Sequence, residues 1–226
     1  MRYPNVCRAV FVERPNRFVA RCLLEGEPII VHVKNTGRCR ELLVPGAAVW
    51  LTKSENPARK TAFDLIAVEK GSRLINMDSN APNAAFGEYV RAGTFLPDAQ
   101  KIRSEVRWGD SRFDFCLESG GKTHFIEVKG VTLEENGVVR FPDAPTERGI
   151  KHLRELQRAA AEGYGAHVVF VIQMEDVGHF SPNDDTHPAF GTALREAARN
   201  GVQVHALWCE VTPSTMDIAG TVEIRL

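Results

Sequence analysis

Two carboxylates and an amine lie close together near the middle of the chain, on segments that otherwise carry apolar residues. Asp114 lies within 112–117, and Glu127 and Lys129 lie within 123–131. Clustered carboxylates repel one another, and a divalent cation removes that cost. A lysine beside such a cation can position an attacking water or offset charge on a phosphate. The trio predicts a metal-dependent phosphodiesterase centre; a solvated strand face carries the same short pattern.

Both segments have the two-residue alternation of β-strands, which positions the three polar side chains. The apolar residues that share a face are Phe113, Phe115 and Leu117 in the first strand and Ile126 and Val128 in the second. Ser119-Gly120-Gly121 is a turn signal between them. If the strands pair as a hairpin, the carboxylates and the lysine converge on one spot. Oxygen ligands there suit Mg²⁺ or Mn²⁺, which complete their shells with water and phosphate.

Longer sequence blocks extend this pattern. They are H-V-K-N-T-G-R-C-R-E-L-L-V-P-G (32–46), S-E-V-R-W-G-D-S-R-F-D-F (104–115), I-E-V-K-G-V-T-L (126–133) and F-P-D-A-P-T-E-R-G-I-K-H-L-R-E-L (141–156). The spacing D-x12-E-V-K resembles the PD-(D/E)xK nuclease superfamily. The blocks together, in this order, resemble the sugar fermentation stimulation protein A family over nearly the whole chain.

That resemblance implies a two-domain α+β or α/β chain that binds DNA. Residues 1–80 would form an OB-like β-barrel, and 81–226 a PD-(D/E)xK nuclease-like mixed sheet flanked by helices. In such folds a glutamate on the helix before the first core strand often faces the metal, so Glu88 is a candidate third acid. A surface helix glutamate is the alternative for Glu88.

Composition sets the broad class. The chain has 226 residues, 43% hydrophobic and 25% charged, with a net charge of −1, so a nucleic-acid surface would have to be a local basic patch. Five scattered cysteines form no C-x-x-C pair, which favours reduced thiols and a cytoplasmic protein. No stretch is long and apolar enough to suggest a membrane segment.

The first part of the chain predicts a barrel. Strand patterns at 7–12, 17–24, 28–34, 47–52, 64–69 and 73–76 are separated by Pro-Asn, Glu-Gly and Pro-Gly turns. Several short strands in this length fit an OB-fold, which binds nucleic acid through a strand face and its loops.

Basic residues supply the candidate nucleic-acid contacts. A loop at 34–40 combines turn-forming residues with positive charge, and its backbone N–H groups are suited to a phosphate. The candidates are Arg14, Arg17, Lys34, Asn35, Arg38 and Arg40 in the barrel, with Arg148 and Lys151 at the start of a later helix. The alternative for each is a solvated basic residue.

The second part predicts helices alternating with strands. Helices are expected at 84–92, from Thr146 as N-cap to 162, and at 188–200, with strands at 104–108, 138–141, 166–173, 202–211 and 221–226. The segment 179–187 has two histidines and two aspartates, but its spacing matches no common zinc pattern and favours a loop.

We therefore predict a DNA-binding protein with an Mg²⁺-dependent nuclease-like site, and no membrane partner. The alternative is a DNA-binding regulatory factor of sugar (maltose) metabolism that keeps the nuclease scaffold without cleaving. A sugar-responsive or protein-interaction role rests on the family's name alone. The form of the DNA strand is left open, and a homodimer is one expected state, because many nuclease-like proteins act as dimers.

Overall fold

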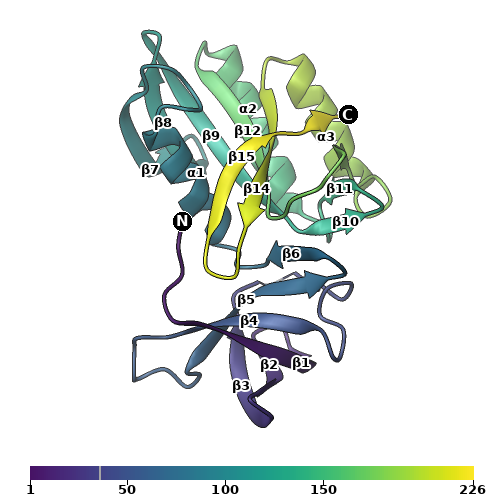
Figure 1. Cartoon of the computed structure of the whole chain (residues 1–226). Helices are drawn as coiled ribbons and strands as arrows, with labels where there is room; N and C mark the ends of the chain where they lie inside the picture. The colour runs from purple at the N-terminus through teal and green to yellow at the C-terminus, as the bar shows by residue number, and fades with distance from the viewer. Residues whose placement is uncertain (36) are drawn as a thin grey trace.

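The computed structural model describes residues 1–35 and 37–226, so Thr36 of the basic loop lies outside the described residues. Figure 1 shows a small barrel below a larger mixed sheet packed with helices. The N-terminal segment connects these two parts. The Met1 amino group donates to Met216 O at 3.0 Å beside the larger sheet, and the chain then enters the barrel.

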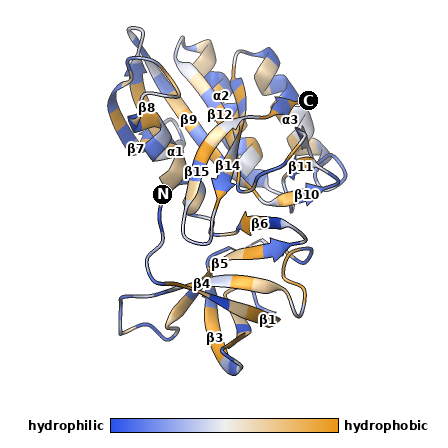
Figure 2. Cartoon of the chain, viewed as in Figure 1, coloured by the Kyte–Doolittle hydropathy of each residue, from blue (hydrophilic) through white to orange (hydrophobic). Residues whose placement is uncertain are grey.

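Six strands form the N-terminal sheet, in the order β3-β2-β1-β4-β5-β6. They are β1 (Val6–Asn16), β2 (Val19–Leu24), β3 (Glu27–Val33), β4 (Ala48–Lys53), β5 (Phe63–Lys70) and β6 (Arg73–Asn76). β3 also pairs in parallel with β5 through His32–Asp64, which closes β1–β5 into a barrel. Ala20, Val31 and Leu51 have no exposed surface, and Figure 2 shows hydrophobic and hydrophilic residues mixed along the barrel strands. The predicted OB-like barrel is confirmed.

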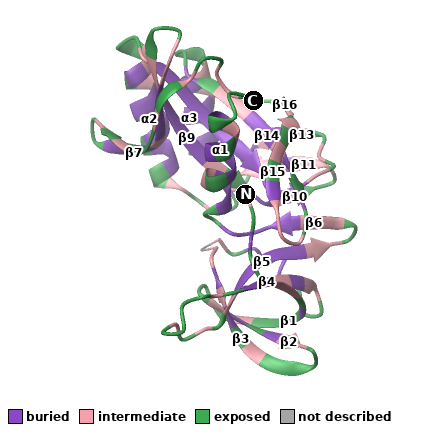
Figure 3. Ribbon diagram, turned by 60° about the vertical axis from the view of Figure 1, so that its left-hand side comes forward, coloured by how far each residue is buried: buried purple, intermediate pink, exposed green. Residues whose placement is uncertain are grey.

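The larger sheet has six strands in the order β15-β14-β12-β9-β8-β7. They are β7 (Gln100–Trp108), β8 (Ser111–Ser119), β9 (Lys122–Val131), β12 (Gly165–Ile172), β14 (Gln203–Val211) and β15 (Met216–Thr221). β12 runs parallel to β9 and β14, and every residue of β12 is buried. This matches a strand covered on both faces, as its apolar run predicts. Figure 3 shows the larger sheet around β9 largely in purple, as buried.

Helices cover both faces of this sheet. In the described residues they are α1 (Ala81–Arg91), α2 (Glu147–Ala161) and α3 (Pro188–Arg199). Phe86 of α1 packs in one core with Val169, while Leu153 of α2 packs in the other core with Phe170. Because side chains alternate along β12, α1 and α2 lie on opposite faces. Across the described residues, none of the helices combines the length and apolar character that crossing a bilayer requires.

A small second sheet has the order β10-β11-β13-β16. Its strands are β10 (Leu133–Glu135), β11 (Val138–Phe141), β13 (His179–Pro182) and β16 (Glu223–Ile224). The predicted loop at 179–187 is thus partly a strand, which is stabilised by pairing with β11 and β16. His187 accepts a hydrogen bond from Thr146 N at 3.2 Å. No cluster of three metal-binding side chains occurs among the described residues.

Three histidines form a hydrogen-bonded chain across the larger sheet. His124 Nδ1 lies 2.9 Å from His167 Nε2, and His167 Nδ1 lies 3.1 Å from His205 Nε2. Burial lowers the pKa of His167 to about 3 and of His205 to about 4. The rings are therefore neutral near pH 7. A neutral ring has one N–H donor and one acceptor nitrogen, so a single proton between each pair of rings completes the hydrogen-bonded chain.

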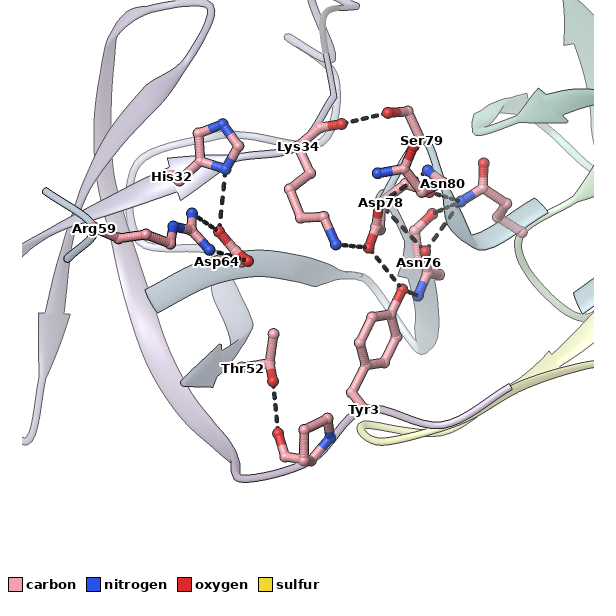
Figure 4. A network of polar contacts seen from close by, with 12 residues as sticks. Tyr3, His32, Lys34, Thr52, Arg59, Asp64, Asn76, Asp78, Ser79 and Asn80 are labelled. Atoms are coloured by element: carbon pink, nitrogen blue, oxygen red, sulfur yellow. Dashed lines mark hydrogen bonds and ion pairs between the residues drawn. The ribbon is translucent and has the colours of Figure 1, made fainter. Parts of the chain in front are cut away.

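A buried polar network joins the barrel to the larger sheet (Figure 4). Asp78 is buried and accepts hydrogen bonds from Lys34 Nζ at 2.5 Å and Tyr3 Oη at 3.3 Å. Gln173 Nε2, at the end of β12, donates to Asn76 O at 3.0 Å and to Asp78 O at 3.2 Å. Each partner satisfies an otherwise costly buried group, so the network fixes how the two parts meet.

Candidate functional site

The candidate carboxylates lie where two strands of the larger sheet separate. The β8–β9 pairing runs from Ser119–Lys122 to Phe115–Ile126. Beyond this last pair, Asp114 Oδ2 accepts a hydrogen bond from the backbone N–H of Val128 at 2.8 Å. A side chain has thereby replaced a strand partner, and Asp114 lies in the fork where β8 stays paired with β7 and β9 with β12.

The structure differs from the predicted hairpin in one detail, which is the face of the sheet on which the apolar side chains of β8 lie. Phe113 packs against Phe125 with ring centroids 5.4 Å apart, on the α2 face. Phe115 packs against Phe86 of α1 at 5.4 Å, in the other core, together with Leu117. The three do not share one face as predicted, because the strand alternation is interrupted where β8 leaves β9.

Glu127 and Lys129 lie together on β9, as predicted. Glu127 is 3% exposed, and its Oε1 accepts a hydrogen bond from Lys129 Nζ at 2.5 Å. Burial favours a raised pKa for Glu127, but the His152 hydrogen bond and the Lys129 charge outweigh it and hold the pKa below its usual range. Glu127 is therefore an anion at neutral pH.

The second oxygen of Glu127 is the unsatisfied atom of the site. Among the described residues, Glu127 Oε2 is buried and has no hydrogen-bond partner. Burial and the charge of Glu127 raise the pKa of Asp114, so the two carboxylates are close enough to repel. Two neighbouring carboxylates, one with a buried oxygen that lacks a partner, fit a hard divalent cation, with water and phosphate as its remaining ligands.

Glu88 is not brought to this pair. Its carboxylate is 59% exposed and lies 2.8 Å from the Met1 amino group. Asn83, on the same helix, donates to Asp114 Oδ1 at 2.9 Å. Five residues turn an α-helix through roughly 140°, so Glu88 faces away when Asn83 faces the site. The helix does contribute to the site, but through Asn83.

His152 was not predicted to contact Glu127. It is 5% exposed, its Nδ1 hydrogen-bonds Glu127 Oε1, and the same nitrogen lies 3.5 Å from Lys129 Nζ. Arg148 Nε lies 3.4 Å from His152 Nε2, which extends the network to the surface. The available signal is positional, because His152 falls beside Leu153 and Leu156 on the buried side of α2.

The basic loop of the barrel is held by Arg14. Its two terminal nitrogens donate to Asn35 O at 2.6 Å, Arg17 O at 2.7 Å, Gly37 O at 2.8 Å and Arg38 O at 2.9 Å. These four bonds use all the N–H groups on the two nitrogens. Arg14 is thus a loop clamp, and its two terminal nitrogens have no N–H group left for the phosphate contact that the sequence predicts.

The other predicted nucleic-acid contacts divide into two groups. Lys34 is paired with buried Asp78, and Asn35 Oδ1 accepts from Gly37 N at 2.7 Å, so both stabilise the junction and its loop. Lys151 donates to Asp110 O at 2.8 Å. In contrast, Arg17, Arg38 and Arg40 are exposed and line one groove of about 660 Å³.

Comparisons with known proteins match this architecture. Residues 12–77 match the family model described as the SfsA N-terminal OB domain, and residues 80–215 match the sugar fermentation stimulation protein RE domain. A sugar fermentation stimulation protein homolog of Desulfitobacterium hafniense (strain Y51) is 54% identical over 226 residues, covering 100% of this chain and 99% of that one. One from Ruminiclostridium cellulolyticum is 51% identical over 226 residues, covering 100% of both chains.

A solved structure is similar over the same length. It is described as Pyrococcus furiosus SfsA in complex with Ca²⁺, and its sequence is 27% identical to this chain. The two structures have a TM-score of 0.91, covering 100% of this chain and 98% of the other. The relative thus shares the barrel and the nuclease-like sheet, and was solved with a divalent cation.

Proposed function

The chain belongs to the sugar fermentation stimulation protein family, and on that premise we propose that it binds DNA and hydrolyses phosphodiester bonds with a divalent metal, Mg²⁺ or Mn²⁺. The observation that carries the proposal is the unpartnered, buried Oε2 of Glu127 beside Asp114 in the strand fork. An unsatisfied buried carboxylate oxygen is costly, and a bound cation compensates it. The Ca²⁺ complex of the Pyrococcus furiosus relative supports a divalent ion in this fold.

The residues of the site have separable roles. Asp114 and Glu127 would hold the cation, which when bound polarises a phosphate oxygen and acidifies water. Asn83 and Val128 N fix the Asp114 carboxylate through one hydrogen bond to each oxygen. Lys129 is held by Glu127 at 2.5 Å, where its charge can stabilise the negative charge that develops on phosphate. His152 fixes Glu127 from the α2 side.

A second candidate function is DNA binding without cleavage, in a regulatory role related to sugar metabolism. One observation favours it. Both oxygens of Asp114 already accept a hydrogen bond, and Lys129 is already paired with Glu127, so much of the cluster is stabilised without substrate. A metal bound there would then be structural.

Cleavage of end-labelled DNA in Mg²⁺, Mn²⁺ or EDTA distinguishes the two. The wild type is compared with Asp114→Asn and Lys129→Met, and with Glu88→Gln as a matched control, because Glu88 is an acid outside the strand fork. Binding is measured on the same samples by gel shift. We expect metal-dependent cleavage that is lost in D114N and K129M, retained in E88Q, and accompanied by unchanged binding. Binding without cleavage in every metal would overturn the enzyme proposal.

A further inference from the structure

A groove on the barrel has the chemistry of a polyanion site. Its volume is about 660 Å³, and its lining includes Arg17, Arg38 and Arg40 with the apolar side chains of Phe11 and Leu43. The arginines come from the β1–β2 turn and from the loop after β3. Arg14 clamps this loop through its backbone carbonyls, so Arg38 is presented from a fixed backbone.

The charge in the groove is positive and uncompensated. Glu13 is the acidic residue in the lining, and its carboxylate is paired with Arg21 at 2.5 Å. Within 1–35 and 37–226, neither Arg38 nor Arg40 has an ion-pair partner, and both are exposed. Exposed guanidinium groups along an open groove attract a phosphate backbone.

An aromatic side chain outside the groove lining stands beside one of these arginines, Arg17. Phe18 is 54% exposed, an unusual position for a phenylalanine, and the Arg17 guanidinium lies 5.6 Å from its ring centroid. An exposed ring next to a cation provides a stacking surface for a base. A duplex keeps its bases stacked within the helix, so the ring is of use only to an unpaired base.

A second cleft lies between this groove and the strand of the carboxylates. Gly37 lines both the groove and this smaller cleft of about 170 Å³, whose lining also includes Asp143 and Gly130. Gly130 directly follows Lys129 in β9. Ala144, beside Asp143, lies on the rim of the groove. The two cavities therefore adjoin at Gly37, and they lie between the arginines of the barrel and the strand that carries Glu127 and Lys129.

We propose that the groove binds single-stranded nucleic acid, with phosphates on Arg17, Arg38 and Arg40 and a base stacked on Phe18, and that the strand continues past Ala144 to the carboxylates. Binding in the groove is independent of metal. The last step, delivery of a phosphate to Asp114 and Glu127, rests on the proposed function.

Fluorescence anisotropy in EDTA tests the binding, because no cleavage occurs there. A labelled single-stranded oligonucleotide is compared with the duplex of the same sequence. Phe18→Ala is expected to weaken binding of the single strand by roughly 5- to 150-fold, and the duplex little. R38A and R40A should each reduce the salt dependence of log Kd by about 0.7.

Matched controls lie on the same barrel outside the groove lining. Ile30 is 58% exposed, so Ile30→Ala controls for loss of an exposed apolar side chain. Arg8 is paired with Glu69 at 3.1 Å, so Arg8→Ala controls for loss of a charge. Equal affinity for strand and duplex, or a loss in I30A as large as in F18A, would overturn the proposal.

A separate variant tests whether the bound strand continues past Ala144. Ala144→Glu places a negative charge on the rim and is expected to weaken binding of the single strand several-fold. Unchanged binding in A144E would show that the strand does not pass this rim. A protein that binds single strands through Phe18 but never cleaves them would support the groove and refute only the proposed hydrolysis.

Discussion

Replacing Asp114 by asparagine removes one charge from the fork with little change of shape. The introduced side chain can accept from Val128 N with its carbonyl, and its amide can meet Asn83 after the Asn83 amide flips. Burial and the Glu127 charge raise the pKa of Asp114. Between the unfolded and the raised pKa the folded chain holds a proton that the unfolded chain has released, so stability falls as pH rises through this window. Without metal, we expect D114N to be more stable than the wild type at pH 7.5.

Bound metal should make the wild type more stable than D114N. A cation that binds only the folded wild type at 100 times its Kd contributes about 2.7 kcal/mol. For a chain of 226 residues, that stabilisation raises Tm by roughly 5–11 °C. D114N lacks a carboxylate ligand and should gain much less.

Differential scanning fluorimetry over a series of Mg²⁺ and Mn²⁺ concentrations measures both effects. E88Q is the matched control, since Glu88 pairs with the Met1 amino group outside the fork. We expect E88Q to respond to metal as the wild type does. The reasoning is refuted if D114N gains as much Tm from metal as the wild type, or if the wild type does not respond in the millimolar range.

The remaining predictions concern residues that support the site and the fold. His152→Leu should lower the free energy of unfolding by roughly 2 kcal/mol, because the buried hydrogen bond to the charged Glu127 is lost. His152→Asn keeps a donor near Nδ1 and should lose less stability. Equal losses of the two variants in urea unfolding would contradict this role. The neutral His167 and His205 should make the protein acid-sensitive. In the unfolded chain these histidines take up protons near pH 6.5, whereas in the folded chain the pKa of His167 is about 3 and that of His205 is about 4. Stability should therefore fall as the pH is lowered, by about 1 kcal/mol per pH unit for each histidine, and His167→Gln should flatten the urea-midpoint profile between pH 7 and 5. Arg14→Ala should cost roughly 3 kcal/mol and weaken single-strand binding together, because the loop that presents Arg38 loses its clamp; a loss of affinity with unchanged stability would instead make Arg14 a direct contact.

The sequence predicted those parts of the site that lie within a single strand or hairpin. Glu127 and Lys129 are two residues apart on one strand, so their shared face follows from alternation alone. The turn at Ser119–Gly121 set the hairpin and brought Asp114 opposite them. The barrel strands and the buried strand β12 were predicted for the same reason, because each shows its burial in its own sequence.

Tertiary placement decided the rest. The fork at Asp114 exists because β8 stays with β7 while β9 stays with β12, and no local pattern contains that choice. His152 reaches Glu127 only through the way α2 packs on the sheet. Glu88 faces the N-terminus because Asn83 sets the phase of α1 toward the fork. In the sequence Arg14 resembles a phosphate contact, but three of its four carbonyl partners lie more than twenty residues away in the basic loop.

The position of a bound cation tests the central claim most directly. Crystals grown with Mn²⁺ would give an anomalous-difference map in which the metal is located without reference to activity. We predict a peak bonded to Asp114 and to Oε2 of Glu127, absent in D114N crystals. A map with no peak in the fork, or with the cation bound elsewhere while Glu127 Oε2 still lacks a partner, would contradict a metal-dependent phosphodiesterase centre here.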